Sequence, residues 1–405
     1  MDSILHCDLN NFYASVECLK NPSLSLQPLA VGGSEKDRHG IVLAKNIPAK
    51  AFDIRTGETL HSARRKCPGL IVVPPNFPLY SHYAQLTREI YLSYTPQCEP
   101  FGIDEAWLDI RGTGHSPVHL ANTLRAQIKK ELGLTISVGV SFNKIFAKLG
   151  SDMKKPDATT LISPCNFRTL VWPLPVGFLL YVGRKTCQKL HTINVHTIGD
   201  LAHTPKELLR ALLGKQGEMI HSYANGEDRS PVALLTSVRT PKSISNGFTA
   251  KADLCSLREA TEFLYPLCES IACRLRRHAL KGTTLQLSIK SADLSVTQRQ
   301  APLPTPTWLC SEIAPAALRL LENHWPFPQP IRALSVRLTG LFPYESAQLS
   351  FFENPQAQRL DSLEHTLDLL RSRYGNSAVS RAISLNSRFY PDNFNPLPTS
   401  GPLLP

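Results

Sequence analysis

Residues Ile4–Glu17 read ILHCDLNNFYASVE, so an apolar run ends on a carboxylate and two aromatic side chains follow closely. Residues 2–8 predict a short buried strand that ends at Asp8, and residues 13–21 predict a helix behind it. A carboxylate is seldom buried unless it is paired or binds a cation. The pattern therefore directs attention to the edge of a sheet, where an acid and an aromatic pair are expected to lie together.

The chain has 405 residues, a formal net charge of +11 and an isoelectric point of about 9.2. This length suits two to four domains, and the positive charge favours a polyanionic partner, nucleic acid before an acidic membrane surface. A basic protein without such a partner has the same composition. No apolar stretch approaches the ~18 residues of a membrane span, the first residues carry no secretory signal, and the 10 cysteines form no CxxC pair. We therefore expect a protein of the reducing cytoplasm, with free cysteines and no zinc site.

Strand and helix signals alternate up to residue 142, which predicts an α+β sheet domain with an inserted subdomain at roughly 10–75. A proline-containing boundary at 171–177 opens an all-helical region that extends to about residue 235. After a linker, half-buried strands between helices predict a second α+β unit, and residues 357–374 predict a last helix. The chain is therefore expected to fold as several units.

Two acids, Asp104 and Glu105, stand at the turn of a predicted hairpin over residues 101–110. If this hairpin shares a sheet with the strand that ends at Asp8, three carboxylates meet at one edge and repel one another unless cations neutralise them. Mg²⁺ prefers such oxygen ligands, and two Mg²⁺ ions would stabilise the attacking and leaving oxygens of phosphoryl or nucleotidyl transfer. Acid pairs also occur in ordinary solvated turns, so the residues alone leave both interpretations open.

Five motifs in this order resemble those of the Y-family DNA polymerases, specifically the DinB (polymerase IV) type. They are CDLNNFYASVE, FGIDEAWLD, VGVSFNKIFAKLGSDMKKPD, VGRKTCQKL with TIGDLA, and QLSFF, and the match runs from residue 1 to about 385. The resemblance implies a right-hand polymerase of the α+β class. It also implies template-directed, error-prone DNA synthesis across lesions, with two Mg²⁺ ions as cofactors.

The resemblance divides the chain into a palm built on a ferredoxin-like sheet, small fingers, a helical thumb with a helix-hairpin-helix, and an α+β little finger. The expected boundaries are palm 1–10 and 76–165, fingers 11–75, thumb 166–235, linker 236–243, little finger 244–385 and a disordered proline-rich tail 386–405. The little finger would include a clamp-binding motif at 348–352 and the C-terminal helix.

The resemblance implies a metal site at the strand edge. Asp8, Asp104 and Glu105 match the catalytic carboxylates of the family, and the backbone carbonyl of Leu9 would be a further metal ligand. Glu105 would lie nearest to the primer 3′-hydroxyl. Metal coordination would help to deprotonate that hydroxyl, so no dedicated histidine base is required.

The resemblance also implies the nucleotide site. Tyr13 matches the steric gate, whose ring occupies the space of a ribose 2′-hydroxyl, and Phe12 would pack beneath the incoming sugar, although both could be ordinary core aromatics. Lys50 and Lys155 match the basic residues that hold the nucleotide phosphates. Ile47 stands where the family has a tyrosine, and because isoleucine donates no hydrogen bond, we expect a loss of roughly 1.5–3 kcal/mol in nucleotide binding.

Residues 179–202 resemble the thumb's helix-hairpin-helix, whose backbone amides and Lys185 would bind DNA phosphates. Tyr181 and Asn194 replace its usual glycines, and asparagine can still adopt a left-handed conformation. Near the metal site, Asn10 stands where many relatives carry aspartate. A plain helical hairpin in a core is the alternative interpretation of residues 179–202.

The little-finger region carries five basic residues on or beside predicted strands, where one face could follow the duplex backbone: Lys242, Lys290, Arg299, Arg332 and Arg337. The segment QLSFF resembles the bacterial sliding-clamp-binding pentamer. In this interpretation Gln348 makes specific hydrogen bonds, and Leu349, Phe351 and Phe352 enter an apolar groove. A strand end that packs against its own domain is the alternative.

The expected partners are primer-template DNA, dNTP and a sliding clamp, and the expected form is a monomer in the cytoplasm. Ile47 and Tyr181 also support a second hypothesis, a catalytically weak, clamp-tethered adaptor that binds DNA and recruits other polymerases. The set of acids argues against it, because an adaptor needs no metal carboxylates. A basic protein of the membrane surface is disfavoured, since no basic amphipathic helix stands out.

Overall fold

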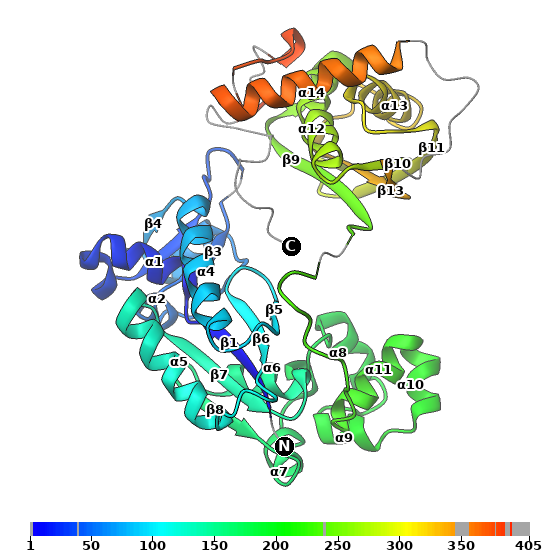
Figure 1. The fold of residues 1–405 in the computed structure, drawn as a ribbon. Helices are drawn as coiled ribbons and strands as arrows, with labels where there is room; N and C mark the ends of the chain where they lie inside the picture. The colour runs from blue at the N-terminus through cyan, green and yellow to red at the C-terminus, as the bar shows by residue number, and fades with distance from the viewer. Residues whose placement is uncertain are drawn as a thin grey trace. The chain divides into compact units, whose positions relative to one another are not determined.

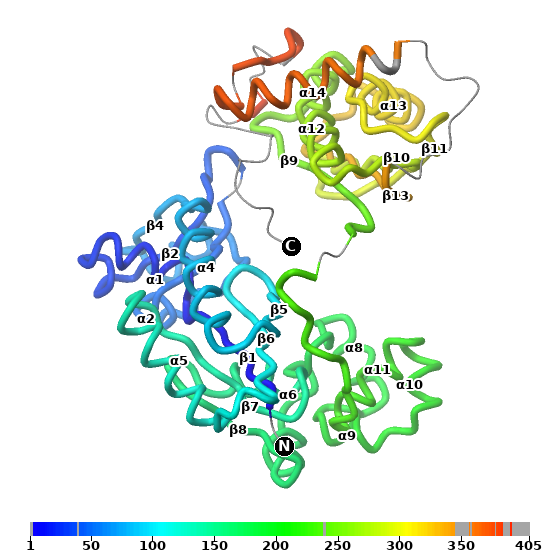
Figure 2. The backbone as a smooth tube through the Cα atoms, in the orientation of Figure 1, coloured from blue at the N-terminus to red at the C-terminus, as the bar shows by residue number. Residues whose placement is uncertain are grey.

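The computed structural model describes residues 3–38, 40–237, 240–344, 356–376, 378–384 and 389–390. The chain forms two compact units, the first from described residues of 3–32 and 42–237, the second from those of 33–41 and 240–390 (Figure 1). The trace in Figure 2 follows the backbone of each unit from element to element. Within the described ranges, we find no helix with the length and apolarity of a membrane span.

The first unit is organised around a mixed five-stranded sheet with the strand order β5-β6-β1-β7-β8. Its strands are β1 (Ile4–Leu9), β5 (Cys98–Pro100), β6 (Glu105–Asp109), β7 (Ile136–Ser141) and β8 (Thr159–Ile162). The central strand β1 runs antiparallel to both β6 and β7. The helices packed on this sheet are α4 (Phe77–Leu92), α5 (Pro117–Leu132) and α6 (Lys144–Met153). The α+β sheet predicted from the sequence is therefore present.

The two faces of β1 meet different helices, because successive side chains of a strand point to opposite sides. Leu5 and Cys7 belong to the hydrophobic core under α4 and α5. Ile4, His6 and Asp8 point to the other face, where α6 lies. All six residues of β1 are buried. Asp8 therefore reaches the α6 side of the sheet near the end of a strand that is covered on both faces.

Helix α6 lies very close to the sheet because β7 has a glycine at its centre. A Cβ atom on Gly139 would stand 1.9 Å from the carbonyl oxygen of Ala147 and 2.5 Å from the amide nitrogen of Ser151. Such distances are far below van der Waals contact, so a side chain at this position would push the helix away. The close approach brings Lys148 and Ser151 of α6 next to β1.

Two smaller groups of elements complete the first unit. A three-stranded sheet with the order β3-β2-β4 carries short helices. Its elements are α1 (Phe12–Lys20), β2 (Leu29–Gly32), β3 (Val42–Lys45), α2 (Ile47–Lys50), α3 (Leu60–Lys66) and β4 (Ile71–Val73). The predicted all-helical region contains α8 (Arg184–His191), α9 (Ile198–His203), α10 (Lys206–Leu213) and α11 (Lys215–Ala224), and α7 (Phe167–Val171) comes just before its predicted boundary.

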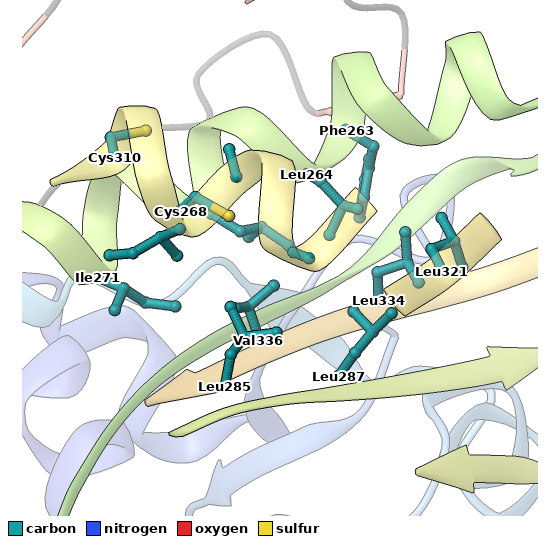
Figure 3. Close-up of a cluster of buried hydrophobic side chains, with 14 of the residues drawn as sticks. Phe263, Leu264, Cys268, Ile271, Leu285, Leu287, Cys310, Leu321, Leu334 and Val336 are labelled. Atoms are coloured by element: carbon teal, nitrogen blue, oxygen red, sulfur yellow. The ribbon is translucent and has the colours of Figure 1, made fainter. Parts of the chain in front are cut away.

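The second unit contains an antiparallel sheet with the order β11-β10-β12-β9, and β13 also pairs with β10. Its strands are β9 (Ser243–Leu254), β10 (Leu280–Ser291), β11 (Val296–Thr307), β12 (Ile331–Thr339) and β13 (Phe342–Pro343). Helices α12 (Leu257–Arg277) and α13 (Cys310–Glu322) pack on one face of this sheet. Figure 3 shows their side chains meeting Leu285 and Leu287 of β10 and Val336 of β12.

The last helix, α14 (Ala357–Tyr374), is joined to α12 by a buried ionic network. The network contains three arginines and three acids: Arg276, Arg371, Arg381, Glu269, Glu364 and Asp368. Arg276 alone reaches Asp368 at 2.6 Å and Glu364 at 3.2 Å. Positive and negative charges balance, as buried ion pairs require. The helix predicted over 357–374 is confirmed.

Some expectations need correction. Phe389 and Tyr390 are buried in the core of the second unit, and the ring of Tyr390 stacks on that of Phe263 with centroids 4.5 Å apart, so the predicted disordered tail does not begin at residue 386. The predicted linker 236–243 overlaps β9 only at Ser243, where that strand begins. The clamp motif at 348–352 lies outside the described residues, as does the tail after residue 390.

Candidate active site

Strand pairing brings the predicted carboxylates to one place. Asp8 and Glu105 are direct partners in the register of β1 and β6, and Asp104 precedes Glu105 in the turn between β5 and β6. The amide of Leu9 donates to the carbonyl of Asp104 at 3.0 Å, which fastens this turn to the end of β1. These four residues line one open cavity of about 390 Å³. The hairpin interpretation and the predicted meeting of the acids are therefore supported by the geometry.

Two lysines, Lys148 within α6 and Lys155 just after it, neutralise part of this acidic edge. Lys148 Nζ lies 3.4 Å from Asp8 Oδ2 and 3.0 Å from Glu105 Oε2. Lys155 Nζ lies 2.7 Å from Asp8 Oδ2, and both ammonium groups also contact Asp152, at 3.0 and 2.8 Å. Four carboxylates, with Asp104 included, thus face these two ammonium groups, and Lys45 and Lys50 line the same cavity.

The environment shifts the pKa of Asp8, Asp104 and Glu105 in different directions. Burial raises the pKa of Asp8 to about 6, although Lys155 acts in the opposite direction. Burial, with the charge of Glu105, also raises the pKa of Asp104. For Glu105 burial is outweighed by His6 and Lys148, which hold its pKa at about 2. Glu105 therefore stays ionised, whereas a cation that approached Asp8 and Asp104 would stabilise their ionised forms.

The donor set fits Mg²⁺ by its chemistry. Carboxylate oxygens and a backbone carbonyl are hard ligands, the kind that Mg²⁺ prefers. In the described part of the chain, however, no three acidic, histidine or cysteine side chains are arranged as a preformed metal site. The ammonium groups of Lys148 and Lys155 contact the same carboxylate oxygens that ions would use.

The aromatic pair behind Asp8 is held rigidly. Tyr13 stacks on Tyr80 with ring centroids 4.3 Å apart and an interplanar angle of 12°, and the edge of Phe77 meets it at 6.0 Å. Both Phe12 and Tyr13 line the cavity, but Phe12 is 3% exposed and also belongs to the core. The Tyr13 ring therefore forms a fixed wall of the cavity beside the acids.

Basic residues of β3 and α2 also line the cavity. Lys50 lines the cavity as the sequence predicted, and Lys45, which the sequence analysis did not select, lines it as well. Lys45 Nζ lies 3.3 Å from Thr56 Oγ1, and burial together with Lys50 lowers its pKa. Ile47 begins α2, is 55% exposed, and does not line the cavity. The cavity thus has cations on both sides of the acids.

Asn10 has a role that aspartate could not fill in the same way. Its side-chain amide donates to Ser137 Oγ at 3.0 Å, and its side-chain oxygen accepts from the amide of Asp157 at 2.9 Å. An ionised carboxylate has no hydrogen to donate. Asn10 therefore ties β1 to β7 and to the segment that carries Lys155.

Residues 179–202, which resemble a helix-hairpin-helix, contain α8 and most of α9. Lys185 is exposed in the first turn of α8. Asn194 has φ 60°, the left-handed conformation expected of it, and Tyr181 has φ 67° in the place of the other glycine. Tyr181 is 51% exposed, so its side chain avoids the core despite this backbone conformation.

The basic residues of the second unit do not all share a face of the sheet. Arg337 pairs with Gln286, four residues before Lys290 on β10, so Arg337 and Lys290 lie on the same face, away from the core. Arg299 pairs with Leu287, which places it on the helix side of the edge strand β11. The other two predicted contacts lie at irregular positions, Lys242 just before β9 and Arg332 where the register of β12 shifts.

Three residues of this site were not predicted from the sequence: His6, Lys148 and Asp152. The sequence does contain a signal for His6, because the alternation of side chains along β1 puts residues 6 and 8 on the same face. Lys148 and Asp152 are one helical turn apart, which is a recognisable ion-pair spacing. Their position beside the acids depends on how closely α6 approaches the sheet.

Comparisons with known proteins agree with this geometry. Residues 7–152 match the impB/mucB/samB family, residues 241–351 match the C-terminal domain of that family, and residues 181–228 match a family described as DNA polymerase-iota, thumb domain. Among solved structures, a Y-family DNA polymerase chimera, Dbh-Dpo4(243-245)-Dbh, aligns with a TM-score of 0.74 and 19% identity over 84% of this chain and 99% of that one. This likeness supports the fold.

Curated relatives carry the sequence evidence. DNA polymerase IV of Acetivibrio thermocellus is 48% identical over 393 residues, which cover 95% of this chain and 98% of that protein. DNA polymerase IV 1 of Bacillus subtilis is 34% identical over 386 residues, which cover 94% of this chain and 93% of that protein. The chain therefore belongs to the Y family of DNA polymerases and is a DNA-directed DNA polymerase of the translesion type.

Proposed function

We propose that the cavity between the main sheet and the small sheet is the site of nucleotidyl transfer, and that two Mg²⁺ ions are held by Asp8, Asp104, Glu105 and the carbonyl of Leu9. The observation that carries this proposal is the direct pairing of Asp8 with Glu105 at a cavity that Asp104 also lines. When bound, the ions would activate the primer hydroxyl and neutralise charge on the phosphates.

The other residues of the cavity have roles that follow from their positions. Lys50 and Lys155 bind the nucleotide phosphates from opposite walls, and the Tyr13 ring excludes a 2′-hydroxyl while Phe12 supports it from the core. The primer 3′-hydroxyl then attacks the α-phosphorus of the dNTP, a new phosphodiester bond forms, and pyrophosphate leaves. Contacts to the thumb hairpin around Lys185 and to the open sheet face with Lys290 and Arg337 would hold DNA by its backbone.

Primer extension tests this function directly. The protein is expected to extend a DNA primer on undamaged and abasic templates with Mg²⁺ and dNTP, and to stop when a chelator removes the metal. A failure to add any nucleotide at any dNTP concentration would support the clamp-tethered adaptor instead. The acids of the cavity and the relatives named DNA polymerase IV favour the enzyme.

The missing tyrosine at position 47 has a measurable consequence. Ile47→Tyr is expected to tighten dNTP binding about tenfold, because the new hydroxyl can donate a hydrogen bond to a phosphate. Its position next to Lys50 in α2 and its exposure leave room for the larger ring. The dissociation constant for dNTP in single-turnover extension measures the effect. Ile47→Phe, which adds the ring without the hydroxyl, is the control, and an equal gain with Phe would refute the hydrogen-bond explanation.

A sliding clamp is the proposed protein partner, through Gln348, Leu349, Phe351 and Phe352. Replacing Gln348 and Leu349 together by alanine is expected to bring the ratio of synthesis with clamp to synthesis without clamp close to one. The reason is that the specific amide contact and one apolar anchor are lost together. The measurement is processive extension on a long primed template with and without loaded clamp. An unchanged ratio would contradict the proposed docking.

The DNA substrate also suggests where the protein acts and in what form. Since the relatives are bacterial DNA polymerases, we place the protein in the cytoplasm, where the bacterial chromosome lies. All the proposed catalytic and nucleotide-binding residues line a cavity of a single chain, so a monomer suffices for activity. Sedimentation of the purified protein would test the monomer.

A further inference from the structure

His6 lies directly beneath the acids and has no part in the proposed chemistry. Its side chain is fully buried on β1 and meets the edge of Trp107 with ring centroids 5.2 Å apart. Its Nδ1 lies 2.8 Å from Ser151 Oγ of α6, and its Nε2 lies 3.3 Å from Glu105 Oε2. The imidazole therefore stands between a hydroxyl and a carboxylate.

Two atoms of this arrangement are buried without an aligned hydrogen-bond partner in the described chain, Nε2 of His6 and Oε2 of Glu105, although Oε2 also lies 3.0 Å from the Lys148 ammonium. They face each other within hydrogen-bonding reach, but the angle between them departs from a hydrogen bond. Buried polar atoms are nearly always paired, and leaving one unpaired is costly. A small rotation that aligns these two atoms satisfies both at once.

The position of the imidazole hydrogen follows from the neighbours. The Ser151 hydroxyl carries one hydrogen, which can go either to the carbonyl of Lys148, 2.7 Å away, or to Nδ1 of His6. In the first case a singly protonated ring donates through Nδ1, and a bare Nε2 then faces a carboxylate oxygen, which is repulsive. In the second case Nε2 carries the hydrogen and donates to Glu105. A doubly protonated ring would also donate from Nε2.

We propose that His6 is a positioning residue, which donates from Nε2 to Oε2 of Glu105 while Ser151 fixes the imidazole through Nδ1. His6 thereby restrains Oε2, while the Lys148 ammonium lies 3.0 Å from Oε2 and 3.1 Å from Oε1. Hydrogen bonds from a second layer of residues to a metal ligand commonly change affinity or activity by about 10- to 100-fold. This inference rests on the proposed role of Glu105 as a metal ligand.

Matched substitutions at position 6 separate positioning from packing. His6→Gln places an amide donor where Nε2 stands, whereas His6→Asn reaches only the place of Nδ1 and Ser151. We expect His6→Gln to keep the native maximal rate of nucleotide addition within about threefold, and His6→Asn to lower it by about tenfold. The dissociation constant for dNTP in single-turnover extension should stay unchanged in both variants. Binding of Mn²⁺ alone, followed by electron paramagnetic resonance, should weaken by about tenfold in His6→Asn only.

A second variant distinguishes the loss of the hydrogen bond from a folding defect at this buried position. Ser151→Ala removes the hydroxyl but suits a helix, and it should lower the rate severalfold in the native background and not further in His6→Asn. Thermal unfolding checks that each variant is folded. Equal losses in His6→Gln and His6→Asn, a native rate in His6→Asn, or multiplying effects of the two sites would overturn the proposal. If Glu105→Ala retains extension, the proposed function itself fails, so the two failures are distinguishable.

Discussion

Replacing Asp8 or Glu105 by alanine is expected to lower primer extension by about 10³-fold or more, because each change removes charge stabilisation at the reacting phosphate. Asp8 pairs with Glu105 in the sheet, and both line the cavity. Both side chains lie at the cavity and not on the surfaces proposed to hold the DNA backbone. The affinity for primer-template DNA should therefore stay nearly native. Single-turnover extension measures the first effect, and fluorescence anisotropy of labelled DNA measures the second.

The control for these variants is an acid on the same unit but away from the cavity. Glu131 is exposed near the end of α5, and Glu131→Ala should leave both the rate and DNA binding unchanged. Extension at native rates by Asp8→Ala or Glu105→Ala would refute the metal assignment. A loss of DNA binding in step with the loss of rate would instead indicate a misfolded sheet, since both acids lie on its strands or at their ends.

Tyr13→Ala is expected to raise ribonucleotide incorporation relative to deoxynucleotide incorporation by about 5- to 150-fold. This range corresponds to a steric clash of about 1–3 kcal/mol between a rigid ring and a 2′-hydroxyl. The ring is rigid because Tyr80 stacks on it and Phe77 packs against it in a T-shaped contact. The ratio of incorporation efficiencies for matched rNTP and dNTP measures the change.

Tyr13→Phe is the matched control for the gate. It keeps the ring and its stacking on Tyr80 but removes the hydroxyl, so a purely steric gate predicts nearly native sugar selectivity. If Tyr13→Ala leaves selectivity unchanged, the gate role is lost. If Tyr13→Phe behaves like Tyr13→Ala, the hydroxyl rather than the ring discriminates between the sugars.

The elements that the sequence predicted well are those whose burial is periodic. Strand β10 alternates between buried Leu285, Leu287, Ile289 and polar neighbours, so its pattern alone identifies it. Strand β11 was not predicted because Pro302, Pro304 and Pro306 lie within it. The sheet tolerates these prolines because β11 is an edge strand. The first residues of strand β9, on the opposite edge, also give a weak strand signal, because they include serines, an asparagine and Gly247.

The acids of the cavity were predictable because a strand end and a hairpin turn are local features. The cations that face these acids were only partly predictable from the sequence. Lys148 reaches Asp8 and Glu105 because α6 lies against Gly139, and this approach is a tertiary contact between residues that no local pattern links. The role of His6 likewise depends on Ser151, which lies 145 positions away in the sequence.

The ionic network beneath α14 makes the attachment of this helix depend on every one of its charges. Its arginines and acids share partners, so the removal of one charge leaves another in the interior without its counterpart. Breaking a buried pair in this way is destabilising by about 3–5 kcal/mol. The loss of a single member would therefore loosen α14 from α12 by much more than a surface ion pair is worth.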